Sequence, residues 1–194
     1  MAKGQGFRFG TSFTSKAIMI GINFAMTAYS VLMEGFTLTF SQLSYWVIVI
    51  LTLHLCVSLK CSLDPEINKK FNWLAIHHVS FETLSPMNLL VIIVYWSILR
   101  ANVVNNECDT LVAYIHTTLV HSLPLLFNIL TFLKTDIVVK ATHAVFIVPI
   151  AIVYGFLNYQ AFKRLGHPVY DFLPWTDIWT PITIAGLATG CMLA

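Results

Sequence analysis

The feature that most constrains this chain is a series of six long apolar stretches, separated by short segments that hold nearly all of its charged residues. A helix needs about 20 predominantly apolar residues to cross the hydrocarbon core of a bilayer. Only 10% of the 194 residues are charged and 57% are hydrophobic, whereas about 25% of the residues of a soluble domain are charged. The chain therefore cannot cover a water-facing surface, and the sequence predicts an integral membrane protein.

The apolar stretches predict an all-α polytopic fold, with a single domain over residues 1–194 and six transmembrane helices in one bundle. We expect the spans at residues 17–33, 36–59, 74–99, 111–133, 137–159 and 178–193, with residues 1–16 as a basic N-terminal extension. The connections between the spans are too short to hold a folded soluble domain.

The distribution of positive charge predicts the orientation of the bundle. Eight of the 11 lysines and arginines fall in the N-terminal extension and in the second and fourth connections. Because positively charged loops stay on the cytoplasmic side of a membrane, both termini are expected in the cytosol or in the mitochondrial matrix. The extension carries Lys3, Arg8 and Lys16, and no acidic residue precedes Glu34. This bias favours the mitochondrial inner membrane; the endomembrane system and the plasma membrane are the alternatives.

Polar residues inside the expected spans are the first candidates for a functional site, because ionisable groups in membrane helices usually face the bundle interior or a wet cavity. In the span 74–99, His78 and Glu82 are four residues apart and share a helix face. They form either an acid–base couple or an interfacial pair. Asn88 follows Pro86 and can bond to a neighbouring helix where the proline loosens the backbone.

The span 111–133 reads "LVAYIHTTLVHSLPLLFNILTFL" and contains two histidines, His116 and His121. His121 lies about ten residues from the outer end, which is about 15 Å of helix. A buried imidazole needs a hydrogen bond, so His121 is either a helix–helix contact or a catalytic base. The segment "EGFTLTFSQL" supplies Thr37, Thr39 and Ser41 from the same outer end. A threonine hydroxyl becomes a nucleophile only beside such a base.

Other chemistries lack their motifs in this sequence. It contains no GxSxG turn for an exposed serine and no HExxH metal motif. Its four cysteines do not have metal-ligand spacing. We therefore expect no metal and no cofactor. The net charge of +2 is scattered over the segment ends, so no nucleic-acid partner is expected.

With "GFTLTF", "LLVIIVYWSIL", "HTTLVHSLPLL" and "GFLNYQAFKRLGHPVYDFLPW" in hand, the chain resembles the androgen-induced/androgen-dependent membrane hydrolases and the related rolling stone family over residues 35–175. The resemblance implies a six-helix fold and the hydrolysis of fatty-acid esters of hydroxy fatty acids by a membrane threonine and a histidine. The nucleophile's position then falls on Thr39. His116 keeps the following Thr-Thr of the family pattern, whereas His121 keeps the adjacent Leu-Pro and is preferred as the base.

The chain also departs from that family pattern. The family's second histidine is Thr118 here, and the acid expected later in the same helix is absent, with Asn128 and Thr131 nearby. These departures and the short connections favour an accessory subunit of a larger membrane complex, such as the mitochondrial respiratory chain, that contacts lipids and sister subunits. The alternative is an intramembrane lipid-ester hydrolase with Thr39 as nucleophile and His121 as base.

Overall fold

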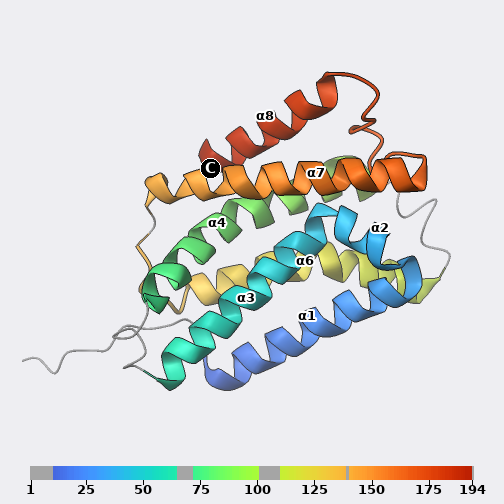
Figure 1. The fold of residues 1–194 in the computed structure, drawn as a ribbon. Helices are drawn as coiled ribbons and strands as arrows, with labels where there is room; N and C mark the ends of the chain where they lie inside the picture. Colours follow the sequence, from blue (N-terminus) through green and yellow to red (C-terminus); the bar gives the residue numbers. More distant parts are fainter. Residues whose placement is uncertain (1–10, 65–71, 101–109, 139, 194) are drawn as a thin grey trace, which may run out of the picture.

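The computed structural model describes residues 11–64, 72–100, 110–138 and 140–193, so Lys3 and Arg8 of the expected extension lie outside the described residues. The described chain is helical. Its elements are α1 (Phe13–Glu34), α2 (Phe36–Ser41), α3 (Leu43–Leu63), α4 (Trp73–Val94), the π-helical turn η2 (Tyr95–Leu99), α6 (Leu111–Phe132), the 3₁₀ turn η3 (Ala141–Phe146), α7 (Ile147–Leu165) and α8 (Trp179–Leu193) (Figure 1).

Among the described residues, four helices are long and apolar enough to cross a membrane: α1, α3, α4 together with η2, and α6. This confirms the all-helical, membrane-like character of the chain. The 15-residue α8 is shorter than a full crossing needs, and the 19-residue α7 ends with Lys163 and Arg164. The count of six spans and the side of the termini stay predictions.

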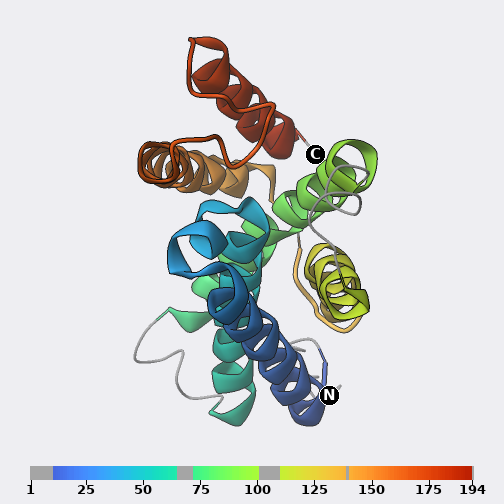
Figure 2. The same ribbon diagram turned by 90° about the vertical axis from the view of Figure 1, so that its right-hand side faces the viewer.

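The core of the bundle forms where α1, α3, α4 and α6 meet. Its fully buried side chains are Met19, Val47, Leu51, Leu55, Leu84, Met87, Val91 and Phe127. α7 and α8 pack together on the side of the bundle opposite α1 (Figures 1 and 2). Large apolar side chains such as Leu32 and Ile152 remain exposed on the outer faces, as expected for helices in contact with lipid.

The expected second span, 36–59, is not one helix. Gly35 adopts φ 82° and separates α1 from α2, a conformation that glycine adopts without steric penalty. Gln42 is extended, with φ −91° and ψ 133°, and separates α2 from α3. Two distant side chains bind the backbone at this break: the Asn158 amide donates to the Ser41 carbonyl (2.9 Å), and the Leu43 N–H donates to the Tyr170 hydroxyl (3.1 Å).

The expected fifth span, 137–159, also differs from the structure. The regular helix α7 begins only at Ile147 and continues to Leu165. The preceding segment is held to α4 by Glu82, whose carboxylate accepts the Lys140 backbone N–H (2.6 Å) and contacts His143 Nδ1. These contacts explain why a 3₁₀ turn replaces the first turns of the expected helix.

Candidate functional site

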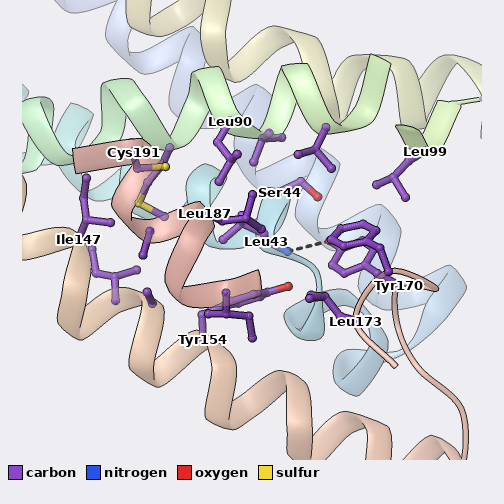
Figure 3. Close-up of a pocket in the computed structure, with 18 of the residues that line it drawn as sticks. Leu43, Ser44, Leu90, Leu99, Ile147, Tyr154, Tyr170, Leu173, Leu187 and Cys191 are labelled. Carbon is purple, nitrogen blue, oxygen red and sulfur yellow. Dashed lines mark hydrogen bonds between the residues drawn. The ribbon is translucent and has the colours of Figure 1, made fainter. Parts of the chain in front are cut away.

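An apolar cavity of about 70 Å³ lies where the first turn of α3 meets α4, α6, α7, α8 and the connection before α8 (Figure 3). Its walls are mainly aliphatic and include Leu90, Ile150 and Leu187. The hydroxyl- and imidazole-bearing side chains that line it are Ser44, His121, Tyr154 and Tyr170. An apolar pocket with a few convergent polar groups is the usual form of a small-molecule site.

His121 is held in this wall by a bond within its own helix. Its Nδ1 lies 2.8 Å from the Thr117 carbonyl oxygen, and because a carbonyl can only accept, Nδ1 must carry the proton. In the neutral imidazole the lone pair then belongs to Nε2, which forms no hydrogen bond within the described part of the chain. The ring also stacks on Tyr95, with centroids 3.9 Å apart and an interplanar angle of 8°. The imidazole is therefore oriented as an acceptor.

Tyr95 belongs to the π-helical turn η2, whereas the sequence predicts one regular helix over 74–99. Such turns are rare and often mark functional sites in helices. Here the turn carries the ring that stacks on His121. Leu99 at its other end lines the cavity.

His116 has a different environment. Its Nε2 lies 2.7 Å from Ser30 Oγ and 3.2 Å from the Tyr45 hydroxyl, and its ring packs on Tyr29 with centroids 4.4 Å apart. These contacts join α6 to α1 and α3. His116 is thus part of a helix–helix contact.

Thr39, the expected nucleophile, is fully buried in α2. Its hydroxyl donates to the Gly35 carbonyl one turn earlier, at 3.0 Å. Thr39 is not among the residues that line the cavity, and no hydrogen bond between described residues joins it to His116 or His121. The pairing of Thr39 with a histidine therefore stays a prediction.

Ser44 lines the cavity that His121 lines, and sequence analysis did not select it. Its side chain is 2% exposed, and its hydroxyl has no hydrogen-bond partner within the part of the chain that the structure describes. Leaving a buried hydroxyl unpaired costs about 1–3 kcal/mol, so this group requires an explanation. The sequence signal was present as one more serine in "TLTFSQLSYW", but only the packing shows that Ser44 lines the cavity.

A network of polar side chains from α7 and the connection before α8 closes one end of the cavity. Asn158 donates to Tyr154 (3.3 Å) and accepts the indole N–H of Trp175 (2.6 Å). Tyr154 and Tyr170 both line the cavity. Together with the contacts to Ser41 and Leu43, this network fixes the start of α3, and with it the position of Ser44.

The second polar region expected from the sequence lies elsewhere. Glu82 is bound by His143 and the Lys140 backbone, so its carboxylate contacts η3 as well as its own helix. A larger cavity, of about 580 Å³, adjoins it and is lined by Glu82, Ser85 and Asn128. Asn128 donates to Ser85 at 3.0 Å. Sequence analysis missed the partnership of Glu82 with His143, because the two residues are 61 positions apart.

Polar residues of α1, α3 and α4 also meet inside the bundle. His54 Nδ1 lies 2.9 Å from Ser80 Oγ, and its ring stacks on His77 with centroids 4.6 Å apart. Lys16 donates to Ser62 at 2.8 Å. Across the described segments, no three His, Cys, Asp or Glu side chains come together as a metal site.

Comparison of the chain with protein-family models, with curated proteins and with solved structures finds no match in any of the three. The helices and the cavity themselves place the chain in a broad class: an α-helical membrane protein with an apolar cavity between its helices. The likeness to the androgen-induced hydrolases and rolling stone proteins remains a prediction from the quoted motifs.

Proposed function

We propose that the protein hydrolyses lipid esters within the membrane, with His121 as the general base. The observation that carries this proposal is the orientation of His121, whose Nδ1 donates to the Thr117 carbonyl while its ring borders an apolar cavity. A histidine whose Nδ1–H is fixed by an acceptor has the tautomer that a proton-accepting Nε2 requires.

The cavity walls match the chemistry of such a substrate. Aliphatic side chains from α4, α7 and α8 suit an acyl chain that enters from the bilayer. The imidazole would take a proton from a hydroxyl nucleophile and return it to the departing alcohol. The resemblance assigns the nucleophile to Thr39, and this assignment is part of the prediction to be tested.

The test is ester turnover by the purified chain in lipid nanodiscs, with a fluorogenic fatty-acyl ester as substrate. We expect turnover above that of empty nanodiscs. His121→Gln should lower it about 10²–10⁴-fold, the usual contribution of a general base. The matched control is His167→Gln, since His167 is exposed on the connection after α7. Folded wild-type protein without turnover would refute the hydrolase.

A second function is supported by a different observation. Thr39 and His116, two of the three residues expected to carry catalysis, have their polar atoms bonded within the bundle. This favours an accessory subunit of a larger membrane complex, with the mitochondrial inner membrane as its expected location. Native mass measurement after mild extraction from the source membrane tests it: co-migration with a large complex supports the subunit, and a chain that runs alone excludes it.

A further inference from the structure

Thr39, Ser41 and Ser44 lie around the break between α2 and α3, and of these three hydroxyls that of Ser44 alone has no hydrogen bond among the described residues. Thr39 donates to the Gly35 carbonyl at 3.0 Å, and Ser41 donates to the Leu38 carbonyl at 2.6 Å. Serine and threonine commonly bond in this way to a carbonyl three or four residues earlier in a helix. Ser44 has no such partner.

The helix break explains why Ser44 is different. The carbonyls three and four residues before it belong to Ser41 and Phe40, on the other side of the extended residue Gln42. The Ser41 oxygen accepts the Asn158 amide, and the Phe40 oxygen accepts the Trp46 indole N–H at 2.9 Å. Among the described residues, the Ser44 hydroxyl bonds to neither carbonyl.

Ser44 lines the cavity that His121 also lines. It is 2% exposed, and Figure 3 shows it beside Leu43, the first residue of α3, whose N–H bonds to the Tyr170 hydroxyl. It also lies in the first turn of a 21-residue helix whose N-cap, Gln42, makes no side-chain capping bond. The positive end of that helix favours negative charge on a reacting oxygen.

We propose that Ser44 is the nucleophile that His121 activates, an inference that rests on the proposed hydrolase function. Ser44 Oγ attacks the carbonyl carbon of the lipid ester while His121 Nε2 accepts its proton. The bond between the carbonyl carbon and the alcohol oxygen breaks, and His121 returns the proton to that oxygen. Water then attacks the acyl-Ser44 ester with His121 again as base, which releases the fatty acid and restores both side chains.

The substrate class follows from the walls around these two groups. Leu90, Ile150 and Leu187 give an aliphatic lining. At about 70 Å³ the cavity has room for the ester group at Ser44 and the first carbons of the acyl part, so the rest of a long chain would stay in the bilayer. The site would take carboxylic esters presented from the membrane. It has no described cationic side chain in its lining to bind a phosphate.

The experiment is adduct mapping on the full chain in nanodiscs with an alkyl fluorophosphonate, which reacts with activated serine and threonine hydroxyls. Chymotryptic cleavage after Phe40 separates Thr39 from Ser44, and fragmentation distinguishes Ser44 from Ser41. We expect the adduct on Ser44. Ser44→Ala and His121→Gln should each lower labelling at least 100-fold, whereas the matched variant Ser41→Ala should label like the wild type.

The outcomes separate the two proposals, and the mapping on wild-type protein does not depend on how any variant folds. An adduct on Thr39 would overturn the assignment of Ser44 and leave the hydrolase function standing. An unlabelled chain that is folded by circular dichroism and cooperative thermal unfolding would overturn the hydrolase function and Ser44 with it.

Discussion

The two histidines of α6 have the same chemistry and lie five residues apart, yet their surroundings differ. On a helix, five residues correspond to a rotation of about 140°, so His116 and His121 occupy different faces. His116 Nε2 is bonded to Ser30 and lies near the Tyr45 hydroxyl. Among the described residues, His121 forms a hydrogen bond through Nδ1 alone, to its own helix. The difference between these two histidines shows that the helix face on which a histidine lies determines whether it packs against neighbouring helices or lines a cavity.

The largest effect is expected from removing the His121 ring. His121→Ala should lower ester turnover about 10²–10⁴-fold, because the proton acceptor is lost. Added imidazole should restore part of the rate, since the deleted side chain leaves a ring-sized space beside the cavity. Turnover is measured in nanodiscs with and without imidazole. Full activity in His121→Ala would contradict the assigned role.

The second prediction concerns a substitution that fills the cavity and leaves its polar side chains unchanged. Ala188 lines the cavity, so Ala188→Trp should occupy the acyl site and lower ester turnover at least tenfold. Ala185 lies on the exposed side of the same helix, and Ala185→Trp is the matched control. Equal turnover in the two variants would show that the cavity does not hold substrate.

The third prediction concerns stability at the other histidine. His116→Ala removes the hydrogen bond between the imidazole and Ser30 in the contact between α1, α3 and α6, while Ser30 keeps the Tyr45 hydroxyl as a partner. We therefore expect a loss of about 0.5–1.5 kcal/mol in unfolding free energy. Reversible unfolding in mixed detergent measures it. His167→Ala, on the exposed connection, should change stability by no more than about 0.5 kcal/mol. Equal losses of unfolding free energy in the two variants would show that His116 has no particular structural role.

The smallest effect is expected at the ring that stacks on His121. Tyr95→Leu removes an aromatic contact, and such pairs contribute about 0.5–1.5 kcal/mol beyond their buried area. Turnover should fall less than in His121→Ala, because the bond to Thr117 still orients the imidazole. A loss as large as that of His121→Ala would show that the stack, and not the backbone bond, positions the base.

The sequence predicts the helices well wherever apolar length alone determines them. The expected span 111–133 matches α6 at Leu111–Phe132, because an uninterrupted apolar run has one natural structure in lipid. The break at Gln42 could not be predicted in the same way. It is held by Asn158 and Tyr170, more than a hundred residues away.

The sequence selects only some residues of the candidate site. His121 is selected by its depth in a span, whereas the choice between His116 and His121 depends on which helices surround α6. Ser44 resembles its neighbours Thr39 and Ser41 in sequence, and the structure is needed to show that its hydroxyl has no hydrogen bond among the described residues. Similarly, the helical spacing predicts that Glu82 pairs with His78, but the Glu82 carboxylate also contacts His143 of η3.

The central claim is that His121 holds its proton on Nδ1 and offers Nε2 to the cavity. Nitrogen-15 magnetic resonance of the chain labelled at histidine, in nanodiscs, measures this directly, and the resonances lost in His121→Gln assign the ring. We predict a neutral His121 with a protonated Nδ1 and an unprotonated Nε2. A neutral ring protonated on Nε2 would contradict the geometry and, with it, the role of His121 as a base.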